Sequence, residues 1–546
     1  MPVSTTAEKL KPIRKRCAKA YEDSHDWREL TDELNDYTLT HRTGVNRHTG
    51  HARSKNRHAA HDATAGKARQ RFAGRMSRDV TPPFQKFSEI KLGPASMAKL
   101  QEISQSEEQA KGQADELNKV LETVSNQVQG IFERAQFALA AEEMYLDLFA
   151  GQGAMLVLED DDDIVQFVSV PATEIAMRED GRGRVNGIYW RKAITAGNLP
   201  GMWKDPQFSS ELAKKIKDTP EQMIAIVQAG EFDAASKRWN LFVYEDEKSD
   251  DPPIFEELGT LTTAWITPRF YKVPGEAHGR GPGLTALPTI KTLDKVTELT
   301  IKAAAFAVLG LWVYRNDRAF NPQTSKMAPG AMWKVRDTSG PQGPSIQKLD
   351  VPGRFDVSNL ILQDLREQVK QITFDDTLPP DAGAVRSATE IVERLNRLQQ
   401  DLSGAFARMV LEIVVPLVKR VVDILQRKGL INLGDFDLDQ LALKIEVTSP
   451  IARAQQAQDI SAIVNWLQIM LQTGGPEMMM MAAKIESIFT EIGRKLGVSP
   501  QLMRSEAEKQ GLQEMVAQII AQSQLGVASN AGGEGTPPAE PAPAQV

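Results

Sequence analysis

The chain has 546 residues, 41% of them hydrophobic, which is enough apolar material for several domain cores. Its net charge of −7 argues against a protein that coats DNA by neutralising phosphates. The longest apolar run, AAAFAVLGLWV at residues 303–313, has 11 residues, whereas a membrane-spanning helix needs about 20. The N-terminus lacks the apolar stretch of a secretory signal. We expect a globular protein without a transmembrane segment, made in the cytoplasm.

The first part of the chain predicts helix over residues 8–40, followed by a basic stretch over 42–78. A His-, Gly- and Asn-rich loop is expected in its first half and a helix in ATAGKARQRFAGRM. Its ten cations are Arg42, Arg47, Arg53, Lys55, Arg57, Lys67, Arg69, Arg71, Arg75 and Arg78.

Four histidines of this stretch have His-x2-His spacing, which resembles a metal-ligand pattern. They are His48, His51, His58 and His61. A basic surface loop is the better interpretation, because no cysteine or carboxylate supports them and the local field is already positive. The single cysteine, Cys17, also excludes a disulfide framework and a cysteine-based zinc site.

A helical region is predicted over 96–150, and then the pattern changes to short β-branched and aromatic runs. Turns at EDDDD (159–163) and EDGRG (179–183) predict an antiparallel β meander. A cation site at EDDDD is disfavoured, because consecutive carboxylates of a strand alternate between its faces. We expect a helical insert over 206–229, after which strands return in RWNLFVYEDE and TTAWITPRFYKV.

The glycine-rich segment PGEAHGRGPGL, residues 274–284, lies between a strand and a helix, where a phosphate-binding loop would lie. It lacks the Lys-Ser/Thr of a P-loop, and Leu284 replaces the third glycine of the dinucleotide fold. A tight turn from sheet to helix is favoured. A helix with a drifting apolar stripe follows, predicted to be contacted on several sides. A small β-containing insert and a second helix, SNLILQDLREQVKQITF, come next, with Ile361, Leu365, Val369 and Ile372 expected on one face.

An acidic, proline-containing loop, DDTLPPDAGAVR, then precedes a long helix predicted over 387–428. Ser387 and Glu390 have the spacing of a capping box, Gly429 is placed as a C-terminal cap, and Pro416 is expected to kink the helix. Its apolar positions recur with a helical period: Ile391, Leu395, Leu398, Leu402, Phe406, Met409, Ile413, Leu417, Val421 and Ile424. A strand in LKIEVTS and three more helical stretches follow. The Met478 to Met481 run predicts core packing. The chain contains no Gly-x-Ser-x-Gly, HExxH or kinase-like pattern, so we expect no catalytic residue, cofactor or metal.

Five segments, in order along the chain, resemble the portal (head-to-tail connector) proteins of short-tailed, podovirus-type bacteriophages. They are HDATAGKARQRFAGRMSRDVTPP, AGQGAMLVLED, HGRGPGLTALPTIKTLDKV, GAVRSATEIVERL and SPIARAQQAQDISAIVNWL. The resemblance implies an α+β, predominantly α, multidomain subunit of a ring, usually a dodecamer, at one capsid vertex. Its axial channel would pass double-stranded DNA.

The resemblance also implies the following division of the chain. Residues 1–281 would form the wing (helical N-terminus plus antiparallel β), 282–308 and 356–374 the stem helices, 309–355 the clip, 375–386 a tunnel loop, 387–450 a long wing helix with a closing strand, 451–525 a helical crown, and 526–546 a disordered tail.

The tunnel loop and the clip hold the candidate functional residues. Acidic groups in the loop would repel DNA phosphates and let DNA slide, whereas a wall of Lys and Arg would hold it. The loop candidates are Asp375, Asp376, Pro379, Pro380, Asp381 and Arg386. The clip candidates for contact with DNA, terminase or tail are Arg315, Arg318, Lys334 and Arg336, for which intersubunit salt bridges are an equal alternative.

Implied partners are copies of the chain, double-stranded DNA, the terminase large subunit, a tail adaptor, the major capsid and scaffolding proteins, and internal ejection proteins at the crown. The protein would lie in the virion at the portal vertex, after synthesis in the host cytoplasm. Two alternatives stay open: a DNA-binding protein that uses residues 42–78 as an arm, and a nucleotide-binding enzyme built on the glycine turn.

Overall fold

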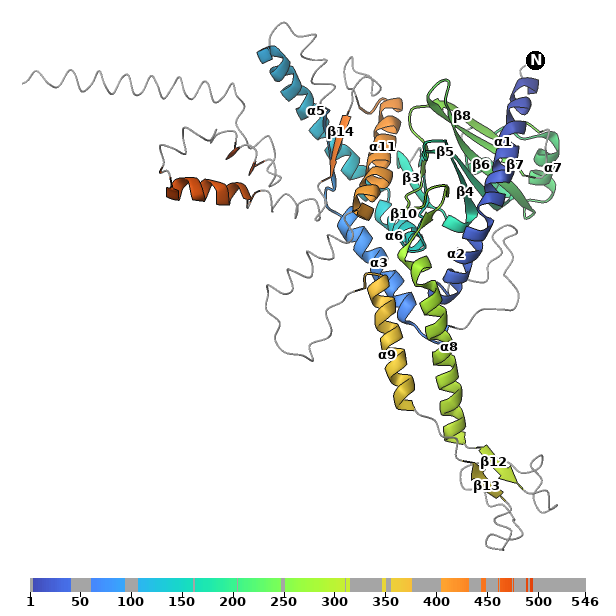
Figure 1. Ribbon diagram of the computed structural model, residues 1–546. Helices are drawn as coiled ribbons and strands as arrows, with labels where there is room; N and C mark the ends of the chain where they lie inside the picture. The colour runs from blue at the N-terminus through green and yellow to red at the C-terminus, as the bar shows by residue number, and fades with distance from the viewer. Residues whose placement is uncertain are drawn as a thin grey trace, which may run out of the picture. The chain divides into compact units, whose positions relative to one another are not determined.

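The computed structural model describes part of the chain, which divides into two compact units, Met1–Ile451 and Ala452–Val546 (Figure 1). The described residues are 3–40, 60–93, 107–160, 163–203, 205–246, 251–309, 311–314, 346–349, 355–375, 404–431, 443–447, 460, 462–473, 475, 488–489 and 492–493. Helices and strands are mixed in the first unit, which confirms the α+β prediction. None of the described helices is long and apolar enough to cross a membrane.

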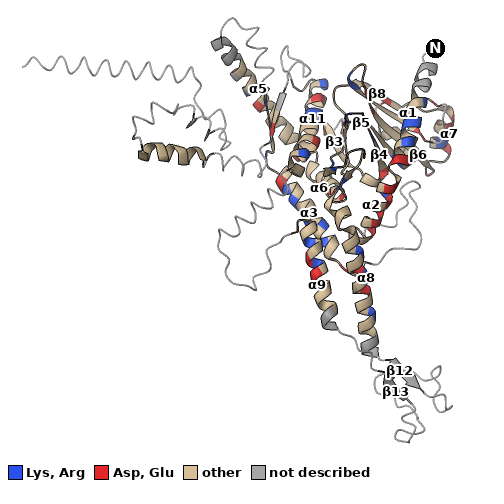
Figure 2. Ribbon diagram, in the orientation of Figure 1, with Lys and Arg blue, Asp and Glu red and all other residues tan. Residues whose placement is uncertain are grey.

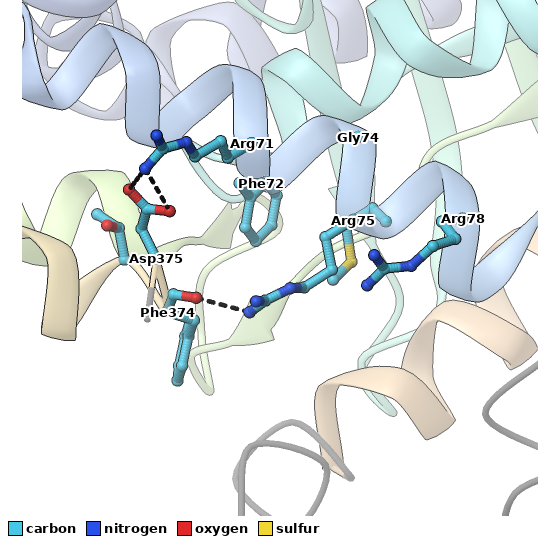
Figure 3. Close-up of a pocket in the computed structure, with 9 residues that line it drawn as sticks. Arg71, Phe72, Gly74, Arg75, Arg78, Phe374 and Asp375 are labelled. Carbon is cyan, nitrogen blue, oxygen red and sulfur yellow. Dashed lines mark hydrogen bonds and ion pairs between the residues drawn. The ribbon is translucent and has the colours of Figure 1, made fainter. Parts of the chain in front are cut away.

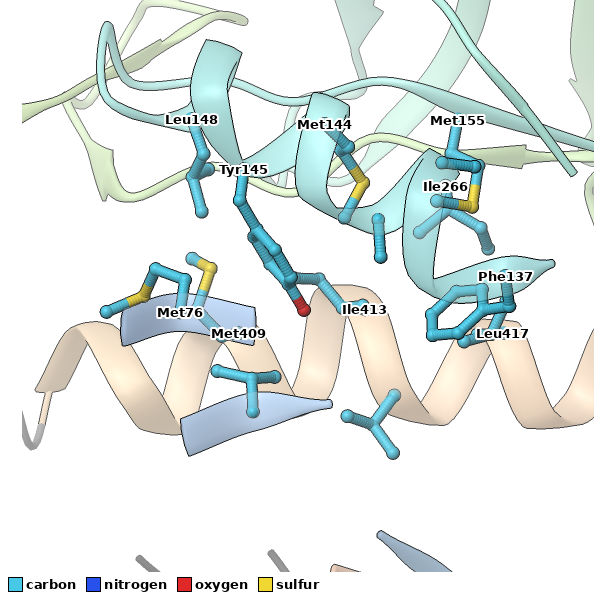
Figure 4. Packing of buried hydrophobic residues seen from close by; sticks show 14 of the residues in the cluster. Met76, Phe137, Met144, Tyr145, Leu148, Met155, Ile266, Met409, Ile413 and Leu417 are labelled. Carbon is cyan, nitrogen blue, oxygen red and sulfur yellow. The ribbon is translucent and has the colours of Figure 1, made fainter. Parts of the chain in front are cut away.

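The described helices of the N-terminal part are α1 Val3–Asp23, α2 His25–Thr38, α3 Thr64–Val80, α5 Glu107–Arg134 and α6 Phe137–Leu148. The predicted helices over 8–40 and in the second half of the basic stretch are confirmed. The apolar faces of α3 and α6 meet residues 405–425 of the long helix in the largest core cluster of the described residues. Figure 4 shows Tyr145 of α6 beside Met76 of α3 and Met409 in this cluster. The Tyr145 hydroxyl lies 2.8 Å from the Thr81 hydroxyl, so its polar end is satisfied within the core.

Two larger antiparallel sheets and three two-stranded pairs form the β part of the described residues, one pair being β10 Tyr271–Lys272 with β11 Gly279–Arg280. The three-stranded sheet has the order β3-β2-β9, and the five-stranded sheet has the order β4-β5-β6-β7-β8. The EDDDD segment joins β2 to β3 and the EDGRG segment joins β4 to β5, as predicted. The strands and the intervening helices are β2 Met155–Glu159, β3 Val165–Ser169, β4 Ile175–Glu179, β5 Val185–Thr195, α7 Ser210–Asp218, β6 Met223–Asp233, β7 Arg238–Glu245, β8 Phe255–Thr260 and β9 Trp265–Ile266, with short 3-10 turns at Ala172–Glu174 and Ala196–Gly201.

The predicted helical insert over 206–229 is wrong in its second half, which forms the central strand β6. Val227 and Ala229 of β6 pack against α1 in one core cluster, while Ile224 and Ile226 pack in another. Because both faces are buried, the strand lacks the polar alternation that marks a half-exposed strand. The short helix α7 is the only part of the expected insert that is helical among the described residues.

A helix–ribbon–helix segment follows the sheets. It consists of α8 Pro282–Leu309, the antiparallel pair β12 Leu311–Tyr314 and β13 Ile346–Leu349, and α9 Phe355–Ile372. The helices α8 and α9 pack side by side (Figure 1). On α9, Val369 is buried as expected, but Ile361 is 46% exposed and its neighbour Leu362 is buried in its place. Leu365 and Ile372 pack against the main core, so the predicted apolar face is covered at these positions and at Val369 but not at Ile361.

The described part of the long helix comprises residues 404–409, a π-helical turn at Val410–Val414, and α11 Val415–Arg427. The π turn immediately precedes Pro416, which cannot donate a backbone hydrogen bond, and accommodates the expected disturbance without a break. Gly429 has φ +68°, its amide donates to Gln426, and the Leu430 amide donates to Leu425. This is the predicted glycine C-cap. The closing strand is confirmed as β14 Leu443–Val447, which pairs with β1 Ser88–Leu92. Residues 387–403 lie outside the described residues.

The second unit is described only over short helical segments, of which residues 462–473 are the longest. Trp466 and Ile469 of this helix are exposed. The Met478 to Met481 run and the predicted tail lie outside the described residues.

Candidate functional site

The start of the acidic loop is fixed by the end of α9. The Phe374 amide donates to the Gln371 carbonyl and the Asp375 amide to the Lys370 carbonyl, 2.8 Å away, which is the hydrogen-bond pattern of a Schellman cap. Phe374 takes the left-handed position at φ +57°, where glycine is usual. Its ring lies 6.4 Å from that of Phe270 and packs on the main core, which explains why an aromatic residue stands there.

Three arginines of α3 lie around this cap (Figure 3). Arg71 Nη1 lies 2.9 and 3.2 Å from the two carboxylate oxygens of Asp375, and Arg75 donates to the Phe374 carbonyl at 2.6 Å. Arg71, Arg75 and Arg78 line a pocket of about 290 Å³ together with residues 373–375. Successive helical spacings of four and three residues place these guanidinium groups on one side of α3. Arg71 and Arg75 therefore hold the point at which the acidic segment leaves α9, whereas Arg78 pairs with Asp79.

Asp375 differs from the free channel carboxylate expected from the sequence. Only 6% of the residue is exposed, and its charge is paired with Arg71. In the single chain it anchors the loop and does not present a free negative charge. The other candidates of the loop and the clip lie outside the described residues: Asp376, Pro379, Pro380, Asp381, Arg386, Arg315, Arg318, Lys334 and Arg336.

The described part of the long helix, which follows the acidic segment in the chain, is fixed by a charge network that the sequence did not reveal. Arg269 donates to Glu412 from its backbone amide, at 2.8 Å, and from Nη2, at 2.9 Å. It also pairs with Glu179 of β4. Burial lowers the pKa of Arg269, but hydrogen bonds and charges from Glu412 and Glu179 outweigh it and raise the pKa above its usual value. Glu412 belongs to the π turn, a type of irregularity frequent at functional sites.

The described part of the basic stretch, residues 60–78, is largely used inside the fold. Arg69 is fully buried and donates to the Leu146 carbonyl and to the side chains of Asn35 and Thr38, each at 2.7 Å. Its Nη2 also lies 3.3 Å from the Asp147 carboxylate. With Arg71 and Arg75 engaged as described above, this half of the stretch is structural, which disfavours an arm that binds DNA.

The glycine turn is also occupied by the protein itself. The amides of Gly281 and Gly283 donate to the carbonyls of Ala150 and Phe149, at 3.0 and 2.9 Å, and the Gly279 carbonyl accepts from the Trp27 ring. A Cβ at Gly281 would collide with the backbone of residues 149–151. These glycines therefore allow close packing of two backbones, and the amides that a phosphate would need are already used.

His61, the described member of the predicted histidine pattern, hydrogen-bonds Asp294 instead of facing a metal. Among the described residues, no group of three or more His, Cys, Asp or Glu could hold a metal ion. His48, His51 and His58 lie outside the described residues.

In the described residues, arginine and glutamate contacts fix the end of α9 and the π turn of the long helix, and the amides of the glycine turn are used within the protein. The model of the family described as bacteriophage head to tail connecting protein matches residues 10–503. The chain belongs to this family.

Two curated relatives agree with this assignment. The chain is 26% identical to the "Probable portal protein" of Bordetella phage BPP-1 over 343 residues, which cover 60% of this chain and 61% of that protein. It is 23% identical to the "Portal protein" of Salmonella phage epsilon15 over 441 residues, which cover 76% of this chain and 77% of that protein. The chain thus spans less than two thirds of the length of the first relative.

Proposed function

We propose that the protein is a phage portal subunit, which assembles into a ring of about twelve copies at one capsid vertex. The ring would be the channel through which double-stranded DNA is packaged and later ejected. The family match over residues 10–503 carries the proposal, and the names of the two relatives support it. The protein would be structural and not an enzyme, so an external motor would supply the ATP hydrolysis.

In this proposal, the segments have the roles that the resemblance implies. The helices α8 and α9 correspond to the stem, the β12–β13 segment to the clip, and residues 376–386, supported by the Asp375 anchor, to the tunnel loop. The clip would bind the terminase large subunit and then the tail adaptor. The wing would face capsid and scaffolding proteins, and the crown at residues 451–525 would face internal ejection proteins.

The paired state of Asp375 refines the proposed charge of the channel. Because Arg71 neutralises Asp375, the repulsion that keeps DNA sliding would come from Asp376 and Asp381, with Arg386 at the loop base. Reversing both to Lys in every copy should make DNA retention by purified rings stronger and more steeply dependent on salt. The exposed Glu256→Lys on β8 is the matched control, because it adds charge away from the loop. Equal retention by the double variant and the control would remove this role from the loop.

The first test of the function itself is electron microscopy of the purified full chain with native mass measured on the same sample. Rings with a central hole and a mass near twelve times 60.3 kDa are expected. A uniform monomer or dimer at all salt and protein concentrations would refute the proposal, and DNA and nucleotide binding would be measured next.

A further inference from the structure

Each helix of the α8–α9 pair has a buried face and, on its opposite side, an exposed stripe. On α8, Leu287, Ile290 and Leu293 are buried, whereas Leu299 is 53% exposed and Lys295 is 65% exposed. At 100° per residue, positions 295, 299 and 302 lie on one side of the helix, away from the buried residues. A basic and apolar stripe thus faces away from the rest of the chain.

The stripe on α9 has the opposite charge. Leu362 and Val369 are buried, whereas Leu360 is 69% exposed and Asp364 and Glu367 are also exposed. Positions 360, 364 and 367 again lie on one side of the helix. The two stripes are complementary, since each combines a leucine with charges of one dominant sign. Figure 2 marks the charged positions along α8 and α9.

The charges of the two stripes are only partly balanced within the chain, since Glu367 pairs with Lys370 at 3.7 Å. Lys295 and Lys302 share one carboxylate, Glu298, at 2.9 and 2.5 Å, which leaves this group with a net positive charge. Hydrogen bonds from the two lysines lower the pKa of Glu298 to about 2. On α9, Asp364 accepts a hydrogen bond from Gln368, and no Lys or Arg in the described part of the chain pairs with it. Lys295 can therefore pair with a second carboxylate, and Asp364 can pair with a cation.

A contact through Asp62 shows which residues of the two helices lie at the same level. The Asp62 amide donates to Asp294 of α8, and the Asp62 carboxylate pairs with Arg366 of α9. We take the level of Asp294 and Arg366 along the two helices as a common reference. The helices run antiparallel with a rise of about 1.5 Å per residue, so Leu299 lies about 7.5 Å and Leu360 about 9 Å from this level, in the same direction. Lys295 and Asp364 lie about 1.5 and 3 Å from it, so the members of the pairs Leu299–Leu360 and Lys295–Asp364 differ in height by only about 1.5 Å.

We propose that α8 of one copy packs against α9 of the next copy in the ring, with Lys295 paired to Asp364 of the next copy and Leu299 packed on its Leu360. A rotation about an axis parallel to the helices keeps every residue at its own level, so residues that are level within one chain also meet between neighbours. Such a head-to-tail contact between two different surfaces is the kind that closes a ring. The inference rests on the proposed ring and names the surfaces that form it.

The test uses two charge reversals in the full chain, Lys295→Glu and Asp364→Lys. Each alone places like charges together in every interface, so the concentration at which half of the protein is in rings should rise at least tenfold. When the two variants are mixed in equal amounts, copies that alternate around a ring of even number pair opposite charges in every interface, and assembly should return to within threefold of the unaltered protein. Lys214→Glu on α7 is the control and should not change assembly.

Ring fractions by native mass and electron microscopy distinguish the possible failures. If the unaltered protein forms no rings, the proposed function fails. If it forms rings and both single variants do so equally well, the function stands and this interface is overturned. Loss in both variants without recovery in the mixture also overturns the pairing, provided that circular dichroism shows both variants folded.

Discussion

The anchor at the start of the acidic segment makes an asymmetric prediction. The Asp375 side chain is 5% exposed, whereas its partner Arg71 is 51% exposed. Arg71→Met leaves a carboxylate buried without its cation, which costs about 3–5 kcal/mol in a fully buried pair. Because water reaches the Arg71 side of this pair, we expect about 1.5–3 kcal/mol. Asp375→Asn leaves an arginine that water can solvate, and should cost about 0.5–1 kcal/mol.

Hydrogen exchange at the Asp375 amide measures this cost locally, because that amide closes the α9 cap by donating to Lys370. Since about 1.4 kcal/mol corresponds to a factor of ten, Arg71→Met should speed exchange at least tenfold, and Asp375→Asn by less than about fivefold. The double variant should resemble Asp375→Asn, because no unpaired charge is then buried. Arg78→Met, on the same helix, is the control. Equal effects of the two single changes would refute the reasoning, and a larger effect of Asp375→Asn would show that Arg71 is the buried partner.

Three further predictions concern the parts that support this segment. Arg69→Met should lower the free energy of unfolding by about 3–5 kcal/mol, since it leaves Asp147 and several buried acceptors without their donor. A loss below about 1 kcal/mol in urea unfolding would contradict the structural role given to Arg69. Gly281→Ala should destabilise more than Gly275→Ala, measured as the shift in melting temperature, because Gly275 has a positive φ but open space, whereas Gly281 is against backbone. Burial, and then the charges of Arg28 and Arg269, lower the pKa of His278 from 6.5 to about 3. The contribution of neutral His278 to the stability of the fold is therefore fully present above about pH 6.5 and is lost as the pH falls toward 3. Relative to His278→Gln, the free energy of unfolding measured by urea titration should fall by roughly 2 kcal/mol between pH 7 and 5. The same dependence of unfolding free energy on pH in both proteins would count against a buried neutral histidine.

The elements that the sequence predicted correctly are those whose signals are local. Gly429 ends α11 because a left-handed residue is needed at that position, and its neighbours make the expected hydrogen bonds. The apolar period of the long helix identified Met409, Ile413 and Leu417, which are all buried. The turns at EDDDD and EDGRG are set by adjacent polar and glycine residues. None of these features depends on a distant part of the chain.

The elements that were missed depend on distant partners. β6 is a strand because α1 covers one of its faces and other strands flank it on both sides. Its apolar residues therefore do not alternate with polar ones, and the period of two that marks a half-exposed strand is absent. Phe374 gave no cap signal, because a non-glycine residue at positive φ is held there by the core around Phe270. Asp375 looked like its neighbours in an acidic loop, but Arg71, far away in the sequence, decides its burial and pairing. The composition of a loop can therefore indicate its class of function without assigning a role to each charge.

The apolar stripe of α8 is a local sequence signal that the single chain explains only in part. Its apolar positions drift around the helix, which predicted contacts on several sides, yet within one chain Leu287, Ile290 and Leu293 are buried and Leu299 is exposed. A drifting stripe that one chain covers on only one side calls for a second surface at the level of Leu299. The exposed α9 stripe lies at that level and has the opposite charge, and a neighbouring copy could bring it there without any change in the fold. The mixing of Lys295→Glu with Asp364→Lys therefore also tests whether a neighbouring copy covers the exposed side of α8 in the ring.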